Sequence, residues 1–348
     1  MRPVPGSISL AVGSTAKWCL APGLLALWLA GCATPKPLMA VNVPVTDLRA
    51  RPETQAQPAV HDPLQESQLL YGEQVQVRKR QGEWVYVEAV EQPELTHARR
   101  WQGYPGWVPA SALRPAEPLA APNIVVTEKW VATWKDWYVR APSPWRFPLG
   151  TRLRAIEMGE QVWRVELLDG EVVWMPYRAA RELEALRALS PEERRRLVVR
   201  NAQLFIGDAY YWGGRSPAAS SSPRDPFGPP GPPAVGGVTG VDCSGLVNLA
   251  YRAAGIDIPR DAHEQFLRAR PVSALRPADL IFLSERGNPS RIVHVMLYAG
   301  GGELIEGPGT GEAVRRIRVT ERLGCPPERL APGSVVDGQT VSFGAYLP

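Results

Sequence analysis

Apolar and polar residues alternate in short runs between about residue 41 and residue 180, and glycine or proline residues separate the runs. This period of two predicts half-buried β-strands joined by turns. The runs fall into two similar sets, at 70–77, 84–87 and 106–109 and again at 149–156, 163–167 and 173–176. We therefore expect two small β-barrels of similar construction, over residues 41–116 and 117–180.

The two sets differ between their second and third runs. There the first set carries an added segment, Gln92 to Gly103, which leads directly into Tyr104. Insertions of this kind are usually tolerated surface loops. The other interpretation is that the added segment forms part of a binding site, and the pattern of residues leaves both open.

Apolar residues change to helical spacing after residue 180. Residues 181–189 predict a charged helical connector. Ser190 and Glu193 form the capping box of a second helix, whose arginines 194–196 we expect on the solvent side. A third helix begins after Asp242, and strand-like runs follow at 278–283, 292–298, 303–306 and 314–319. This order of helices and then strands predicts an α+β domain over residues 181–348.

The first 31 residues carry Arg2, Lys17 and an apolar run, Trp18 to Ala30. The run is shorter than the roughly 20 residues that a membrane-spanning helix needs, so residues 1–31 predict an export signal. The residues Leu-Ala-Gly-Cys at 29–32 resemble a bacterial lipobox, which implies a lipid on Cys32 and a tether over 32–40. Ordinary signal cleavage beside an incidental cysteine is the alternative. Ala33 is similar to the residue at that place in lipoproteins anchored in the outer membrane and facing the periplasm.

Composition excludes several classes of protein. The formal net charge of +4 falls to +2 once Arg2 and Lys17 are removed, which is too weak for a nucleic-acid surface. The four cysteines are scattered, and the four histidines lack metal-ligand spacing, so we expect neither a disulfide framework nor a metal or other cofactor. Residues 216–240 hold seven prolines and five glycines, which predicts a flexible insertion just before Cys243.

Cys243 is a candidate nucleophile because Asp242 is a good N-cap, which places the cysteine in the first turn of a helix. Free backbone N–H groups and the positive end of the helix dipole favour the thiolate there. The alternative is a small buried apolar residue, as most lone cysteines are.

His294 and Glu306 lie at equal distances on either side of Gly300, in a run of three glycines. A hairpin centred on that turn would place the two side chains opposite each other on one face. A carboxylate fixes the ring of a histidine that acts as a base, so Cys243, His294 and Glu306 have the chain order of a thiol triad. A purely structural histidine is the alternative.

Several motifs in this part of the chain resemble the NlpC family of bacterial cell-wall cysteine peptidases. They are Tyr-Trp-Gly-Gly at 211–214, Asp-Cys-Ser-Gly-Leu-Val at 242–247, Pro-Arg-Asp at 259–261, Asp-Leu at 279–280 and His-Val-x-x-Tyr-x-Gly from His294. The resemblance covers residues from about 190 to the end and implies a papain-like catalytic fold. With two SH3-like (SH3b) barrels ahead, the architecture looks like the YkfC-like subgroup. Those enzymes cleave the γ-D-glutamyl–L-diamino-acid bond of peptidoglycan peptides with a free N-terminal L-alanine.

The resemblance implies roles residue by residue. Cys243 would be the nucleophile, His294 the base, Glu306 its orienting residue and Tyr210 part of the oxyanion hole. Substrate contacts would come from Glu66, Tyr104, Trp212, Asp242, Ser244 and Asp261. The third triad position is usually histidine in this family, so Glu306 is a departure that should leave activity intact and shift its pH profile. Cys325 receives no role.

Three hypotheses follow. The first is a lipid-anchored monomeric peptidase that trims released peptidoglycan stem peptides, and the second is a general endopeptidase that acts on the intact wall. The third is a wall-binding lipoprotein without activity. If Glu66 and Tyr104 close the amine end of the pocket, the first is favoured over the second, and an intact triad argues against the third.

Overall fold

A computed structural model of the chain describes residues 38–54, 61–116, 121–218 and 239–348. Within it, residues 36–348 form one compact unit. The predicted export signal, Cys32, most of the predicted tether and most of the insertion at 216–240 lie outside the described residues. Those predictions therefore stay predictions.

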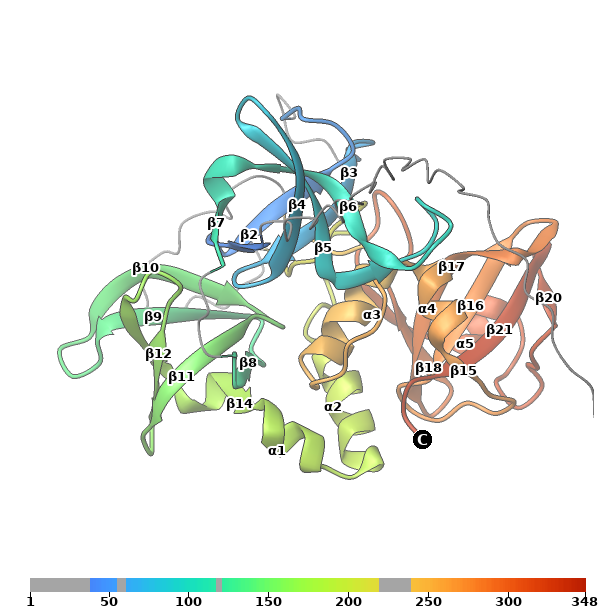
Figure 1. Cartoon of the computed structure of the whole chain (residues 1–348). Coiled ribbons are helices and arrows are strands. Elements are labelled where there is room, and N and C mark those ends of the chain that lie inside the picture. The colour runs from blue at the N-terminus through green and yellow to red at the C-terminus, as the bar shows by residue number, and fades with distance from the viewer. Residues whose placement is uncertain (1–37, 55–60, 117–120, 219–238) are drawn as a thin grey trace, which may run out of the picture. The chain divides into compact units, whose positions relative to one another are not determined.

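The first antiparallel sheet has the strand order β3-β2-β6-β5-β4-β1-β7 (Figure 1). Its elements are β1 (Leu38–Val41), β2 (Val45–Arg49), β3 (Gln65–Leu70), β4 (Gln74–Gln81), β5 (Trp84–Glu94), β6 (Gln102–Pro109), the 3₁₀-helix η1 (Ala110–Ala112) and β7 (Leu113–Pro115). Alternate residues of the strands, such as Val75, Val85 and Val87, are buried in a core of their own. The period of two therefore predicted the strands correctly.

The second sheet has the order β10-β9-β13-β12-β11-β8-β14. Its elements are β8 (Ile124–Val126), β9 (Trp130–Asp136), β10 (Ala141–Pro148), β11 (Arg152–Met158), β12 (Val162–Glu166), β13 (Val172–Pro176), the 3₁₀-helix η2 (Tyr177–Ala179) and β14 (Ala180–Glu182). The two sheets have the same strand order, with β8 in the place of β1, β9 in the place of β2 and so on to β14 in the place of β7. The internal repeat is therefore confirmed. Its core includes Phe147 and Trp163.

The added segment of the first set is partly strand. Strand β5 continues to Glu94 and β6 begins at Gln102, with Pro93 paired to Gly103. The hairpin is therefore extended beyond the one in the second set, and residues 95–101 form its tip. The expectation of a loop over the whole of Gln92–Gly103 was too simple.

The C-terminal part begins with helices and ends with a third antiparallel sheet, in the order predicted. The helices are α1 (Leu183–Ala188), α2 (Pro191–Gln203), α3 (Cys243–Arg252), α4 (Ala262–Arg268) and α5 (Val319–Leu323). The strands are β15 (Arg270–Pro271), β16 (Leu280–Glu285), β17 (Asn288–Gly300), β18 (Glu303–Glu306), β19 (Arg315–Arg318), β20 (Val335–Val336) and β21 (Gln339–Ala345). The sheet runs β15-β21-β16-β17-β18-β19, and β20 pairs with β21.

Helix α2 starts at the predicted capping box, in which Ser190 and Glu193 bond each other's backbone N–H groups. The three arginines after it are not all on the solvent side, however. Arg195 is 3% exposed, pairs with Asp279 at 2.7 Å and donates to the carbonyl of Leu347 at 2.8 Å. Sequence spacing missed this because the partners come from the turn before β16 and from the C-terminus.

Buried arginines of the C-terminal part contact both N-terminal sets of strands and their turns. Arg215 pairs with Glu73 at 2.8 Å, and both side chains are almost fully buried. Arg260 donates to the hydroxyl of Ser67 at 3.0 Å, and Arg252 donates to the carbonyl of Gly150, in the second set, at 2.9 Å. Because unpaired buried charges are costly, these contacts fix the first sheet against the elements that carry the candidate triad.

Candidate active site

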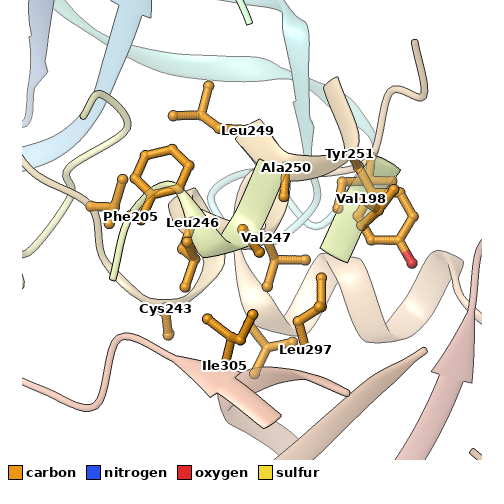
Figure 2. Packing of buried hydrophobic residues seen from close by; sticks show 14 of the residues in the cluster. Val198, Phe205, Cys243, Leu246, Val247, Leu249, Ala250, Tyr251, Leu297 and Ile305 are labelled. Carbon is orange, nitrogen blue, oxygen red and sulfur yellow. The ribbon is translucent and has the colours of Figure 1, made fainter. Parts of the chain in front are cut away.

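The N-cap residue Asp242 and helix α3 fix the position of Cys243. Asp242 is extended, and its Oδ1 accepts the backbone N–H of Gly245 at 2.7 Å, so α3 begins at Cys243 as predicted. Cys243 is 8% exposed. Figure 2 shows it at the start of α3, within the apolar cluster that joins the helix to Leu297 and Ile305. The thiol is therefore held at the positive end of a helix packed on the sheet.

His294 and Glu306 meet across the hairpin of β17 and β18, although the register differs from the one predicted. Leu297 pairs with Ile305, which moves the centre of the hairpin one residue beyond Gly300. His294 is thus not directly opposite Glu306. The offset of two positions keeps both side chains on one face, because successive strand residues alternate. Nε2 of His294 lies 2.9 Å from Oε2 of Glu306.

His294 and Glu306 each stabilise the charged form of the other. Burial by itself would lower the pKa of His294, but the charge of Cys243 and hydrogen bonds with Cys243 and Glu306 raise that pKa to about 9. Burial would raise the pKa of Glu306, but the hydrogen bond and charge of His294, with those of Arg322 and Arg315, lower it to about 2. Because Nε2 faces Glu306, Nδ1 is the nitrogen left for the thiol. The arrangement favours the protonated, imidazolium form of His294.

Tyr210 lies next to the start of α3. Its ring is mostly buried, and its pKa is raised by burial and by the charges of Asp242 and Cys243. Gly307 fits closely between these groups, since a Cβ there would lie 3.3 Å from the Tyr210 ring and 3.5 Å from the backbone nitrogen of Cys243. Sequence reasoning gave Gly307 no role. A larger residue at 307 would press on the Tyr210 ring and on the backbone at the start of α3.

Asp242 and Ser244 are both buried and bonded within the protein. The Asp242 carboxylate accepts from Gly245, from the backbone N–H of Gly213 at 3.1 Å, and from Arg260 at 2.8 Å and 3.1 Å. Ser244 donates to Asp242 at 3.1 Å and accepts from Arg260 at 2.9 Å. A carboxylate has about four acceptor positions, so protein donors occupy those of Asp242.

A second cluster of predicted residues forms beside this network. The Tyr104 hydroxyl lies 3.0 Å from Oδ2 of Asp261 and 3.3 Å from Oε2 of Glu66. Tyr104 is 3% exposed, whereas Glu66 and Asp261 are partly exposed. One hydroxyl proton can serve only one carboxylate at a time, and the nearest cation, Arg260, pairs with Asp242 at 2.8 Å and lies 3.5 Å from Oδ1 of Asp261. The carboxylates of this acidic cluster therefore outnumber the donors that they share. The cluster suits a ligand cation.

The tip of the extended hairpin supplies contacts that sequence reasoning missed. Nδ1 of His97 lies 3.1 Å from Glu94, its Nε2 lies 3.9 Å from Glu66, and its ring lies 5.2 Å from that of Tyr104. Glu264, on α4, is buried and accepts the backbone N–H of Thr96 at 3.1 Å. The position of His97 in the added segment was the one available signal. The Glu264 contact spans too much sequence to be predicted.

Trp212 is placed differently from the other predicted contacts. It is 47% exposed, and its ring packs against that of His61 with 5.6 Å between centroids. The next residue, Gly213, has φ +69, and a Cβ there would lie 2.6 Å from the carbonyl oxygen of Gln65. The glycine thus permits close contact between the motif and the first sheet.

The described part of the chain contains no group of three or more His, Cys, Asp or Glu residues that could hold a metal ion. Cys243 and Cys325 are free thiols, and the sulfur of Cys325 lies 3.6 Å from the carbonyl oxygen of Pro326. Among the helices of the described residues, none has the length and apolar character needed to span a membrane.

Comparison with known proteins finds sequences similar to the region that holds this site. Residues 207–324 match the model of the NlpC/P60 family. Gamma-D-glutamyl-L-lysine dipeptidyl-peptidase of Bacillus subtilis (strain 168) is 28% identical over 266 residues, which are 75% of this chain and 78% of the relative. The protein of the same name from Bacillus cereus is 26% identical over 72% of this chain and 70% of the relative. Peptidoglycan endopeptidase RipA of Mycobacterium tuberculosis is 34% identical over only 34% of this chain and 23% of its own length.

Solved structures agree on the fold. The crystal structure of an NlpC/P60 family protein from Bacillus cereus covers 89% of this chain and is itself covered completely, with a TM-score of 0.68 at 22% identity. The similarity therefore extends over the N-terminal sheets as well as the helices and the third sheet. The protein is thus a cysteine peptidase whose residues 207–324, which hold Cys243, His294 and Glu306, are similar to the NlpC/P60 family.

Proposed function

We propose that the protein hydrolyses the γ-D-glutamyl–L-diamino-acid bond of peptidoglycan-derived peptides that carry a free N-terminal L-alanine. One observation carries the proposal: the first sheet brings Tyr104 and Glu66 against Asp261, close to the helix of Cys243. An acidic cluster with too few donors suits an ammonium group, which offers three. Two relatives aligned over most of this chain are named gamma-D-glutamyl-L-lysine dipeptidyl-peptidases, which supports the same substrate class.

In this proposal the Cys243 thiolate attacks the γ-carbonyl carbon of D-glutamate. The carbonyl oxygen becomes an oxyanion, for which the backbone N–H of Cys243 and the Tyr210 hydroxyl are the nearby donors. His294 gives its proton to the leaving amine of the diamino acid, which departs and leaves a thioester on Cys243.

The second half of the reaction uses the same groups. The neutral His294 takes a proton from water, the hydroxide attacks the thioester, and L-alanyl-D-glutamate leaves while the thiolate re-forms beside the imidazolium. Glu306 receives the Nε2–H of the ring at 2.9 Å throughout, which fixes the ring orientation.

The acidic cluster sets which peptides fit. The substrate ammonium lies between Glu66 and Asp261 and donates to their carboxylates, while the Tyr104 hydroxyl donates to one of them. Ser244 and Asp242 border the peptide but keep their bonds to Arg260. A peptide whose L-alanine is amide-bonded to muramic acid has no ammonium to offer, so the cluster would be left with uncompensated negative charge.

We also propose an overall organisation. The two N-terminal sheets are SH3-like domains, at 41–116 and 117–180, of which the first completes the substrate pocket. Residues 1–31 direct export, and a lipid on Cys32 anchors the protein in the outer membrane on its periplasmic side. Metabolic labelling with a fatty acid tests this: label should enter wild-type protein and be lost with Cys32→Ser.

The decisive comparison uses L-Ala-γ-D-Glu-meso-diaminopimelate and its N-acetylated form, with Cys243→Ala as the control. Mass spectrometry follows release of the dipeptide. Cleavage of the free peptide alone is expected. Equal cleavage of both peptides would favour a general endopeptidase of the intact wall, and no cleavage of either would favour a wall-binding protein without activity.

A further inference from the structure

The Glu306 carboxylate has more partners than an orienting residue requires. It is fully buried, and besides His294 it contacts two arginines. Its Oε1 accepts from Nη2 of Arg315 at 2.8 Å and from Nε of that side chain at 3.0 Å. Nε of Arg322 lies 3.0 Å from each of the two carboxylate oxygens.

The two arginines reach Glu306 from different elements. Arg315 is on β19, directly opposite Glu306 in the pairing of β18 and β19. Arg322 is on α5, which is fixed by the buried side chains of Val319 and Leu323 in a cluster shared with β16, β17 and β18. The carboxylate is thus held from a neighbouring strand and from a helix, so its plane is fixed independently of the histidine.

The charge of this cluster also matters for His294. One carboxylate facing two guanidinium groups cannot give its whole negative charge to an imidazolium. Two other titratable groups face this cluster. Cys243 faces the His294 ring, and Glu312 pairs with the solvent side of Arg315 at 3.0 Å. A carboxylate without the arginines would hold the proton of His294 more strongly, and the ring would release it less readily to the leaving amine.

We propose that Arg315 and Arg322 are positioning residues, which hold the Glu306 carboxylate against His294 and set the upper pH limit of activity. This inference rests on the proposed function, because it assigns a role in the same triad. It also gives a physical reason why a carboxylate can serve at a position usually taken by histidine: the arginines offset most of its added charge.

The chain offers a matched control. Arg316 neighbours Arg315 on β19, but its side chain pairs with Glu303 rather than with Glu306. Arg315 and Arg322 are themselves partly exposed, at 39% and 24% of their side chains, so their replacement does not empty the core. The variants are Arg315→Gln, Arg322→Gln, Arg322→Lys and Arg316→Gln, each checked by circular dichroism and thermal unfolding.

The experiment measures kcat and KM for the free tripeptide from pH 5 to pH 10.5. Arg322→Gln should lower kcat about tenfold and leave KM unchanged. It should also move the alkaline limb of the kcat–pH profile upward by roughly one pH unit. Arg315→Gln should act in the same direction, and Arg322→Lys, which keeps the positive charge, should return the limb toward the wild-type position. Arg316→Gln should change none of these values.

A second arm asks whether the arginine acts through Glu306. In a Glu306→Gln background, Arg322→Gln should cause little further loss of kcat. The effects of two substitutions do not add when one residue acts through the other. Additive losses, or an alkaline limb that stays in place in Arg322→Gln, would overturn the inference while wild-type cleavage continued to support the proposed function. An inactive wild-type enzyme would instead count against the proposed function.

Discussion

Binding of the free amine should depend on pH through Asp261. Partial burial is the largest cause that raises its pKa, the charges of Asp242 and Glu264 add to this, and Arg260 and Tyr104 oppose it, so that the pKa reaches about 7. The geometry gives the same answer, because the Tyr104 hydroxyl lies within 3.3 Å of both Asp261 and Glu66 and can donate to one of them. In the empty site a proton on Asp261 supplies the missing donor.

The substrate ammonium replaces that proton. A protonated Asp261 is neutral and offers no charge to the ammonium, so the affinity for the protonated peptide is half lost at about pH 7 and falls further as pH decreases. If only the ionised carboxyl binds, linkage gives an affinity, per peptide whose amine is protonated, about tenfold weaker at pH 6 and about 100-fold weaker at pH 5 than at pH 8. Binding at pH 6 should release close to one proton per peptide.

The assay is titration calorimetry of the tripeptide into Cys243→Ala protein, in buffers of different ionisation enthalpy. Asp261→Asn should bind more weakly at pH 8 and with little dependence on pH. Asp257→Asn is the matched control, since Asp257 pairs with Arg152 and Arg252 outside the acidic cluster. An affinity that stays constant from pH 5 to pH 8 in the wild-type background would refute the reasoning.

Three further predictions follow from single contacts. Tyr104→Phe removes a hydroxyl bonded to carboxylates, a bond worth about 1.5–3 kcal/mol, so kcat/KM for the free tripeptide should fall roughly 10- to 150-fold. Unchanged kinetics would exclude the hydroxyl from the pocket. With the pKa of His294 at about 9, kcat at saturating peptide should hold up to about pH 9 and decline above it, and a decline of kcat centred near pH 7 would contradict the triad. Arg215→Met leaves Glu73 without its closest partner and should lower the free energy of unfolding by about 3–5 kcal/mol in urea titrations, and a loss under about 1 kcal/mol would show that the pair is dispensable.

The sequence predicted those features that local chemistry controls. Asp242 capping the Cys243 helix, the capping box of Ser190 and the strands of the repeated sets all depend on residues close together in the chain. The proximity of His294 and Glu306 was also predicted, although its register was not. Three successive glycines allow the turn to shift, and the prediction survived because the shift was an even number of residues.

Other features depend on contacts between distant segments and left no local signal. Arg195 lies in a run of three arginines, which is typical of a solvent-exposed helix face. It is nevertheless buried and donates to the carbonyl of Leu347 near the C-terminus. The contacts of Arg315 and Arg322 with Glu306 require β19 and α5 to pack on the hairpin, and no spacing in the chain encodes this. Glu264 accepts from Thr96, which lies 168 positions away in the chain. Long-range ion pairs of this kind are where sequence patterns carry least information.

The central claim is that Cys243 attacks the γ-carbonyl of D-glutamate and forms a thioester. Acid quenching of the enzyme with the tripeptide, followed by peptide mapping in the mass spectrometer, tests this directly, and Cys325 serves as the internal comparison because it is the other free thiol among the described residues. The account predicts an L-alanyl-γ-D-glutamyl group on the peptide that contains Cys243 and none on the peptide that contains Cys325. An acyl group on Cys325, an alanyl group alone, or rapid turnover by Cys243→Ala would contradict it.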